Sequence, residues 1–306
     1  MKIAIIGGGG WIGSPTAFHI ATRGLADEVL LIDVRKAWAE QHAVDMSTAV
    51  AMLGVEVKAG DYADMAGADV VINTAGIPHT GDRAEMLGKN THLLRDIAGH
   101  IRTYCPEALV ITATNPVDPL NYATFRAGGI ARRQVIGYSL NDSFRFREFV
   151  AAAKGVPVGA VEATVIGEHG PLQVPLFSSV RIAGEPVSFT EAEKQAIIAA
   201  RPEAFKKIEV LQKETGRTAG WTCAVGLAQL VAAIAGDTGE VFPASVILDG
   251  EYRLTGIGMG VPVRLGRSGV REILEWDLAA DEQAALDVCA ARVGADCRSV
   301  DQALSA

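Results

Sequence analysis

The chain has 306 residues, of which 49% are hydrophobic and 21% charged, and its formal net charge is −8. This composition fits a folded chain with a sizeable core, divided into two domains or built as one large α/β domain, and it disfavours disorder. The acidic balance, with no basic patch, argues against nucleic acid as a partner. Because no apolar run reaches the roughly 20 residues of a membrane helix and no signal peptide is recognised, we expect a cytoplasmic protein without a membrane partner.

The first half of the sequence alternates two kinds of segment. Short apolar runs rich in β-branched residues predict strands, and longer amphipathic stretches between them predict helices. The predicted strands are 3–6, 29–32, 69–73, 109–112 and 134–136, and the helices include 11–23 and 85–104. Nearly continuous apolar strands between helices are typical of a parallel sheet covered on both faces. With right-handed crossovers this gives a doubly wound α/β sheet of the Rossmann type.

The pattern changes after residue 141. An amphipathic helix at 142–154 leads into longer, more alternating strands, and these are interrupted by further helical stretches. We predict strands at 161–166, 174–182, 241–248 and 262–265, and helices at 190–213, 218–235 and 281–293. The sequence therefore predicts a first domain over residues 1–141 and a mixed α+β domain over residues 142–306. No Pro/Ser-rich linker separates the two, so we expect packed lobes with the functional site between them.

The four cysteines give no sign of a metal or disulfide framework. Cys105, Cys223, Cys289 and Cys297 form no Cys-x-x-Cys pair and no cluster with metal-ligand spacing. We therefore expect free thiols in a reducing cytoplasm, and no bound metal.

A glycine-rich segment directly follows the first predicted strand. Gly8-x-Gly10-x-x-Gly13, with Trp11 and Ile12 between the last two glycines, opens a predicted helix. In the Rossmann fingerprint such glycines allow a tight turn and close approach of a pyrophosphate to the helix N-terminus. A glycine-rich turn without a ligand is the alternative interpretation.

An aspartate follows the second predicted strand, 20 residues beyond the last glycine of the fingerprint. There the Asp33 carboxylate would accept hydrogen bonds from the adenosine ribose hydroxyls, and it would repel a 2′-phosphate. We therefore predict NAD as the cofactor in preference to NADP, with the nearby Arg35 and Lys36 acting against that preference. The alternative is a solvated aspartate at a strand end.

Two further strand ends carry small or polar residues. Thr74, Ala75 and Gly76 are small enough for a cofactor to pass close to the backbone, and Asn115 follows the next strand. Ligands of open α/β sheets lie at the carboxyl ends of the strands. We therefore predict that Asn115 contacts the nicotinamide ribose or the substrate oxygen; a turn-forming asparagine before proline is the alternative.

One histidine lies between glycines after an apolar strand. His169 can take the proton of a C2 hydroxyl group and return it in the reverse reaction. If Asp142 meets the other ring nitrogen, it would fix the tautomer and stabilise the imidazolium. Arg145 lies one helical turn after Asp142, on the same face, and its planar fork suits a substrate carboxylate. Arg147 points elsewhere on that helix and is interpreted as structural.

These motifs together resemble the NAD-dependent L-2-hydroxy acid dehydrogenases of the lactate/malate dehydrogenase family. The resemblance covers nearly the whole chain: the glycine-rich turn and residues 74–76, 114–118, 142–145, 167–170 and 261–269. It implies an NAD-binding first domain and a second domain that binds the substrate and carries catalysis. It also implies His169 as acid and base, Asp142 as its orienting partner, Arg145 on the substrate carboxylate and Arg83 as the residue that polarises the carbonyl. A homodimer or homotetramer is implied as well.

The sequence departs from the family pattern around the substrate. The segment 77–90 corresponds to the family's mobile loop and is about two residues short. His79 stands where malate enzymes carry arginine and lactate enzymes usually carry glutamine, so it matches neither. Trp221 falls near the helix that lines the substrate's side-chain pocket, and a core tryptophan is the alternative. The substrate, a small 2-hydroxy or 2-oxo acid, is therefore left open between malate and lactate.

Other classes of protein fit the sequence less well. A metal-dependent NAD glycosidase needs a longer chain and a Cys/His metal site, and a short-chain reductase needs a Tyr-x-x-x-Lys pair that the sequence lacks. The remaining alternative is a non-catalytic or regulatory NAD-binding protein of the same fold.

Overall fold

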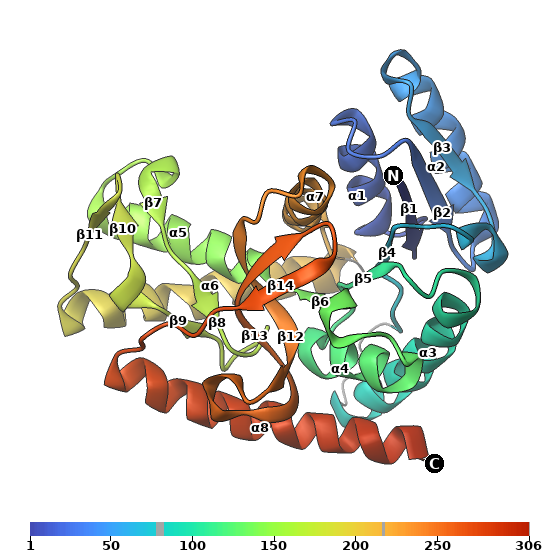
Figure 1. Ribbon diagram of the computed structural model, residues 1–306. Coiled ribbons are helices and arrows are strands. Elements are labelled where there is room, and N and C mark those ends of the chain that lie inside the picture. The colour runs from blue at the N-terminus through green and yellow to red at the C-terminus, as the bar shows by residue number, and fades with distance from the viewer. Residues whose placement is uncertain (78–82, 216–217, 306) are drawn as a thin grey trace.

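The computed structural model describes residues 1–77, 83–215 and 218–305, and a single large sheet runs through the molecule (Figure 1). Six parallel strands lie in the order β6-β5-β4-β1-β2-β3, and the direction of winding reverses between β1 and β4. This is the doubly wound order that the alternating strands and helices predicted. The strands are β1 (Lys2–Ile6), β2 (Glu28–Ile32), β3 (Glu56–Ala59), β4 (Val70–Asn73), β5 (Leu109–Thr112) and β6 (Val135–Tyr138).

Helices cover both faces of this parallel part. Ile3 and Ile5 of β1 belong to a core cluster with α1 and α2, whereas Ala4 and Ile6 belong to a second cluster with α3. Successive side chains of a strand point to opposite faces, so these two clusters lie on opposite sides of the sheet. The helices are α1 (Gly13–Thr22), α2 (Lys36–Val50), α3 (Arg83–Tyr104) and α4 (Val117–Gly128).

Strands from the second half of the chain extend the large sheet of the first half. β12 (Val241–Asp249) pairs antiparallel with β6, and β13 (Thr255–Gly266) and β14 (Gly269–Ile273) continue from it. The nine-stranded sheet therefore crosses from one half of the sequence to the other. Both predicted strands 241–248 and 262–265 exist, but their pairing with the first half was not expected.

The rest of the second half is built from helices and short strands. The predicted strands 161–166 and 174–182 are each broken into shorter pieces: β7 (Val161–Glu162), β8 (Val165–Ile166), β9 (Val174–Pro175) and β10 (Arg181–Ile182), with β11 (Glu185–Pro186) added to β10. Around them lie α5 (Leu140–Lys154), α6 (Glu191–Thr215) and α7 (Trp221–Gly236).

The last helix, α8 (Ala280–Ser305), extends past both halves of the molecule (Figure 1). It contacts α3 and α4 of the first half as well as β13 and β9 of the second. Near its end Asp301 accepts hydrogen bonds from Tyr122 and Arg126 of α4, at 3.0 and 2.9 Å. The helix therefore holds the two halves together along one side. None of the described helices is long and apolar enough to cross a membrane.

Candidate active site

The loop that carries His169 is fixed by contacts with β13 and α8. Gly167 exchanges two backbone hydrogen bonds with Gly260 of β13, at 2.8 and 3.0 Å. Its φ of +85° is a conformation that favours glycine, and an added Cβ would lie 3.0 Å from the sulfur of Cys289. The same sulfur accepts the backbone N–H of Glu168 at 2.9 Å. The histidine therefore follows a rigid backbone rather than a loose turn.

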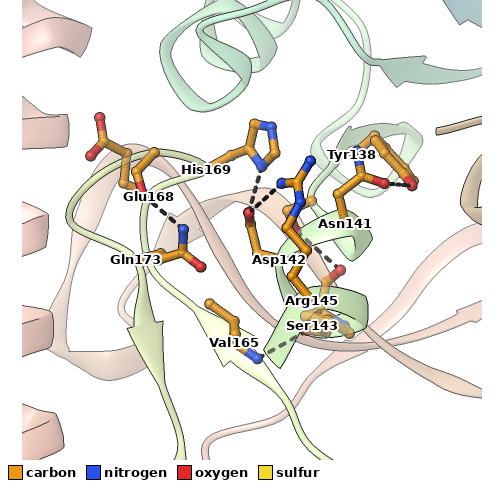
Figure 2. Close-up of polar contacts among 12 residues, drawn as sticks. Tyr138, Asn141, Asp142, Ser143, Arg145, Val165, Glu168, His169 and Gln173 are labelled. Carbon is orange, nitrogen blue, oxygen red and sulfur yellow. Dashed lines mark hydrogen bonds and ion pairs between the residues drawn. The ribbon is translucent and has the colours of Figure 1, made fainter. Parts of the chain in front are cut away.

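His169 meets the carboxylate that the sequence assigned to it. Its Nδ1 atom lies 2.5 Å from Oδ2 of Asp142, on α5, and the other ring nitrogen is turned away from that aspartate (Figure 2). The side chain of Asp142 is 5% exposed and that of His169 is 16% exposed. A hydrogen bond between Nδ1–H and the carboxylate leaves Nε2 as the nitrogen available for proton exchange with a ligand.

Arg145 shares the same carboxylate. One turn along α5, its Nη1 atom lies 3.6 Å from Oδ1 of Asp142, so the histidine and the arginine both contact this aspartate (Figure 2). The arginine side chain is 28% exposed, which leaves part of the guanidinium accessible. Arg147, two residues on, instead donates from Nε to the carbonyl of Ala163 at 3.2 Å. The structure therefore separates the two arginines in the way the helical spacing predicted.

The surroundings of His169 favour its charged form. Burial lowers the pKa of the imidazole, but the charge and hydrogen bond of Asp142, together with the charge of Asp118, outweigh burial and the nearby Arg145. The pKa of His169 is therefore raised above its ordinary value of about 6.5. The ring therefore keeps its proton to a higher pH than a free histidine does.

Hydrogen bonds around Asp142 tie α5 to its neighbours. The hydroxyl of Ser143 accepts the backbone N–H of Val165 at 3.0 Å, which joins α5 to the strand just before His169. On the other side, the amide of Asn141 donates to the sulfur of Cys223 at 3.0 Å, and its oxygen accepts the hydroxyl of Tyr138 at 2.6 Å. All four cysteines are free thiols, as expected.

The glycine-rich turn lies at the carboxyl edge of β1. Gly7, which the fingerprint does not include, has a φ of +81°, and an added Cβ would lie 2.7 Å from the Thr74 hydroxyl. A Cβ on Gly8 would lie 2.9 Å from that of Leu31, and one on Gly13 would lie 2.2 Å from the Gly7 carbonyl. The fingerprint glycines thus allow the close packing of turn, strand and helix α1 that the sequence predicted. Gly7 was missed, although it directly follows the first strand.

Asp33 is held against this turn. Its Oδ2 atom accepts the N–H of Gly9 at 3.0 Å, and its Oδ1 atom accepts the N–H of Arg35 at 2.9 Å. The guanidinium of Arg35 lies over the ring of Trp38, 4.7 Å from its centroid, with Nε 3.5 Å from the carboxylate. The aspartate is thereby fixed at the end of β2, beside the glycines.

The remaining predicted cofactor contacts gather at the same edge. The hydroxyl of Thr74 donates to the Ile6 carbonyl at 2.9 Å, and that of Thr114 donates to the Ala75 carbonyl at 2.6 Å. A Cβ on Gly76 would lie 2.7 Å from the Thr114 side chain. Asn115 is exposed just beyond β5, and Ile12 is partly buried against the core. Trp11 is 45% exposed at the start of α1.

Comparison with known proteins places both halves of the chain in one family. Residues 1–137 match the NAD-binding domain of lactate/malate dehydrogenases, and residues 140–302 match their α/β C-terminal domain. The chain belongs to the lactate/malate dehydrogenase family. It is thus a dehydrogenase with NAD as its cofactor.

Individual relatives of the family cover nearly all of the chain. Malate dehydrogenase from Halobacterium salinarum is 40% identical over 300 residues, which make up 96% of this chain and 97% of the relative. A lactate dehydrogenase from Cryptosporidium parvum, solved with lactic acid and NAD, is 34% identical with a TM-score of 0.89, and 98% of each chain is covered. Malate dehydrogenase from Picrophilus torridus is 27% identical with a TM-score of 0.92, covering 99% of this chain and 98% of that one.

The groups at the carboxyl edge of the sheet, which are backbone N–H donors and the Asp33 carboxylate as an acceptor, fit NAD, the family's cofactor. Glycines at the turn leave room for a pyrophosphate, because side chains there would collide with the backbone. The N-terminus of α1 faces this space, and Asp33 stands where ribose hydroxyls would donate.

Three substrate-side predictions have different outcomes in the structure. His79 lies outside the described residues, and Arg83 is the first residue of α3. Trp221 begins α7 and is 73% exposed, so the core alternative for this residue is wrong. It lines an apolar cleft together with Trp11, Phe18 and other residues of α1, α2 and α6. Among the residues that the structure describes, no group of histidine, cysteine and acidic side chains could hold a metal ion.

Proposed function

We propose that this dehydrogenase interconverts a small L-2-hydroxy acid, of the malate or lactate kind, and the corresponding 2-oxo acid. The observation that carries the proposal is the buried contact between His169 and Asp142, with Arg145 beside the same carboxylate. A proton carrier next to an anion-binding arginine is what the oxidation of a hydroxy acid requires.

In this proposal His169 moves the proton and Asp142 holds the histidine in place. When NAD is bound, it accepts the hydride that leaves C2 of the hydroxy acid. His169 takes the proton of the C2 hydroxyl at Nε2, and becomes an imidazolium. Asp142 keeps Nδ1 protonated and stabilises that positive charge. In the reverse direction the imidazolium returns the proton to the carbonyl oxygen.

The other residues bind and orient the substrate. Arg145 donates to the substrate carboxylate through its accessible guanidinium, and Arg83 polarises the carbonyl oxygen as negative charge develops on it. Asn115, exposed at the end of β5, contacts the nicotinamide ribose or that oxygen. His79 and Trp221 lie on the side-chain end of the substrate and contribute to its selection.

The cofactor contacts are proposed residue by residue. Gly8, Gly10 and Gly13, with the intervening Trp11 and Ile12, surround the pyrophosphate, and Asp33 binds the adenosine ribose. Thr74, Ala75 and Gly76 line the cofactor's path along the sheet edge. The positions of these residues at neighbouring strand ends support this arrangement.

Oxidation of NADH with a panel of 2-oxo acids tests the proposal. Oxaloacetate comes first, because a relative named malate dehydrogenase is 40% identical to this chain, and pyruvate comes second, because a lactate dehydrogenase is 34% identical. We expect turnover with at least one of them and formation of the L enantiomer of the 2-hydroxy acid. Tight NADH binding without turnover on any 2-oxo acid would favour the non-catalytic alternative instead.

We also propose that the protein acts in the cytoplasm as a homodimer or homotetramer. The apolar cleft between α1, α2 and α6 supports self-association, since Phe18 and Leu211 are 44% and 48% exposed on it. Sedimentation equilibrium would show a species of two or four chains, and Phe18→Glu should weaken it. A monomer at micromolar concentration would contradict the proposal.

A further inference from the structure

A second buried carboxylate lies directly behind the histidine. Asp118, in the first turn of α4, is 1% exposed, and its Oδ2 atom accepts the backbone N–H of His169 at 2.7 Å. The two residues are 51 positions apart, so this contact joins the first half of the chain to the loop of the second. Neither the binding of the cofactor nor the proton transfer proposed above uses this group.

Few groups stabilise the negative charge of the buried Asp118 carboxylate. Its Oδ1 atom makes no hydrogen bond of normal geometry with the described residues, and neither does the Ser245 hydroxyl, whose influence on Asp118 is therefore weak. Burial raises the pKa of Asp118 to about 6, and the hydroxyl of Ser245 and the His169 N–H offset burial only in part, while the charge of Glu168 adds to the rise. The charge of Asp118 also contributes to raising the pKa of the buried Cys289 and Cys297 thiols. A carboxyl group that served only as an acceptor for one N–H could be replaced by a neutral amide at lower cost.

The negative charge of Asp118 acts on the imidazole. Apart from burial, three charged groups bear on the proton affinity of His169: Asp142 and Asp118 raise its pKa, and Arg145 lowers it. Asp142 makes the larger contribution because it touches Nδ1 directly. Asp118 holds the backbone of the same residue, so its charge lies close to the ring without occupying either ring nitrogen.

We propose that Asp118 is a positioning residue for the acid–base step, anchoring the His169 backbone and adding a second negative charge behind the imidazole. This inference rests on the proposed role of His169. Two carboxylates then favour the imidazolium. Asp142 contacts Nδ1–H directly, and Asp118 acts through its charge from its position at the His169 backbone N–H. Because Asp118 itself loses a proton near pH 6, its contribution to His169 is complete only above that pH.

The variant Asp118→Asn tests the effect of the negative charge separately from the hydrogen bond to the His169 backbone. The amide oxygen of asparagine can still accept the His169 N–H, so the loop stays in place while the negative charge is lost. We expect the pKa of His169 to fall by about half a unit or more, as one partly screened charge a few ångströms away predicts. On the alkaline side of the profile, kcat/KM for oxaloacetate reduction should then be about threefold lower than in the wild type.

The pKa can be measured without turnover. Diethyl pyrocarbonate acylates only the neutral imidazole, and mass spectrometry of the peptide that contains His169 gives its rate of modification at each pH. Glu282→Gln is the matched control, because Glu282 is also a buried carboxylate but is not among the main charges acting on the pKa of His169 or of Asp118. The Asp118 variant should move the modification profile to lower pH, and the Glu282 variant should leave it in place.

A second variant covers the case in which Asp118→Asn does not fold. The Ser245 hydroxyl lowers the pKa of Asp118, so Ser245→Ala should keep Asp118 protonated to slightly higher pH and weaken its effect on His169 between about pH 6 and 7. Unchanged modification profiles in the folded variants would overturn the inference. Absence of turnover on every 2-oxo acid, with the shift in the modification profile still present, would instead overturn the proposed function.

Discussion

The Nδ1 atom of His169 and the Oδ2 atom of Asp142 lie 2.5 Å apart, although 27 residues separate them in the chain. Their meeting does not depend on side-chain rotamers alone. Ser143, next to the aspartate, accepts the N–H of Val165, four residues before the histidine, so the two backbones are joined beside the pair. The orientation of the imidazole is therefore fixed by contacts within the protein itself.

Replacing His169 by asparagine should remove proton transfer while keeping the size of the side chain. General acid–base catalysis contributes about 10²–10⁴-fold, so we expect kcat to fall by roughly that factor with NADH affinity retained. Steady-state kinetics and NADH fluorescence titration measure the two effects. His100→Asn is the control, because His100 stacks on Tyr62 and takes no part in the site. Near-normal turnover in the His169 variant would remove this residue from the mechanism.

The wild type should also show opposite pH profiles in the two directions of the reaction, because reduction of the 2-oxo acid needs the imidazolium and oxidation of the hydroxy acid needs the neutral ring. With the pKa of His169 raised, both profiles should have their midpoint above pH 6.5.

Arg145→Lys should weaken binding of the 2-oxo acid. Lysine keeps the charge but loses the bidentate fork, and charge-assisted hydrogen bonds contribute about 1.5–3 kcal/mol, so KM should rise at least tenfold. Arg147→Lys on the same helix is the control, since its contact with Ala163 points to a structural role.

Arg83→Gln should instead lower kcat, because polarisation of the substrate carbonyl matters most as negative charge develops on its oxygen. If the Arg83 variant changed only KM, its assignment to the carbonyl would be wrong.

Asp33→Ser should narrow or reverse the preference for NAD over NADP. The variant removes the charge that repels a 2′-phosphate and leaves Arg35 able to pair with it. It also removes an acceptor from the N–H of Gly9, so affinity for NAD should fall. Titration with both cofactors tests this, and Asp61→Ser, which removes a carboxylate paired with Lys36 near the same edge, is the control. Tighter binding of NADP than NAD by the wild type would refute the assignment of Asp33.

His79 should bind a second substrate carboxylate poorly, because an unperturbed histidine is mostly uncharged at neutral pH. We therefore expect oxaloacetate not to be strongly favoured over 2-oxo acids with neutral side chains. His79→Arg should raise the relative kcat/KM for oxaloacetate by about tenfold or more. His92→Arg, on the exposed side of α3, controls for added charge. A wild-type preference for oxaloacetate of about a thousandfold or more would contradict the prediction, since one charge-assisted pair accounts for far less.

Asp118→Asn should make the protein more stable at alkaline pH. The pKa of Asp118 is raised from 3.8 to about 6 by burial, so the stability linked to its proton is present below about pH 4 and lost as the pH rises from there to about 6. We expect the variant to gain on the order of 1–3 kcal/mol in free energy of unfolding at pH 8 and much less at about pH 4. Urea denaturation at both values measures the difference. Equal gains at the two values would show that the ionisation of Asp118 is not the cause.

Much of the parallel half follows from hydrophobic patterning. The runs at β1, β2, β4 and β5 are buried on both faces, so their apolar residues are continuous and easily recognised. β3 (Glu56–Ala59) was not predicted because it is an edge strand with two charged residues. α2 (Lys36–Val50) was not predicted either, since its apolar residues are too scattered for a clear stripe.

The residues of the candidate site that belong to sequence motifs could be predicted. The residue whose role depends on its burial could not. His169, Asp142 and Arg145 could be linked by their order and spacing, and the structure brings them together. Asp118 gives no comparable signal, because a carboxylate in the first turn of a helix is ordinarily a solvated end. Its burial results from the contact of α4 with β12 and β13, and the pairing of β12 with β6 cannot be read from strand periodicity.

The continuous sheet has a mechanical consequence. Ala244 and Ser245 of β12 pair with Tyr138 and Gly137 of β6, so hydrogen bonds of one ladder cross the boundary between the two halves. A hinge at this boundary would have to break that ladder, and it would also have to pull α8 away from the elements it contacts on both sides. We therefore expect the two halves to move as one body. Any change of shape on ligand binding should then fall to segments outside the sheet, and the separation between His169 and the cofactor turn should change little.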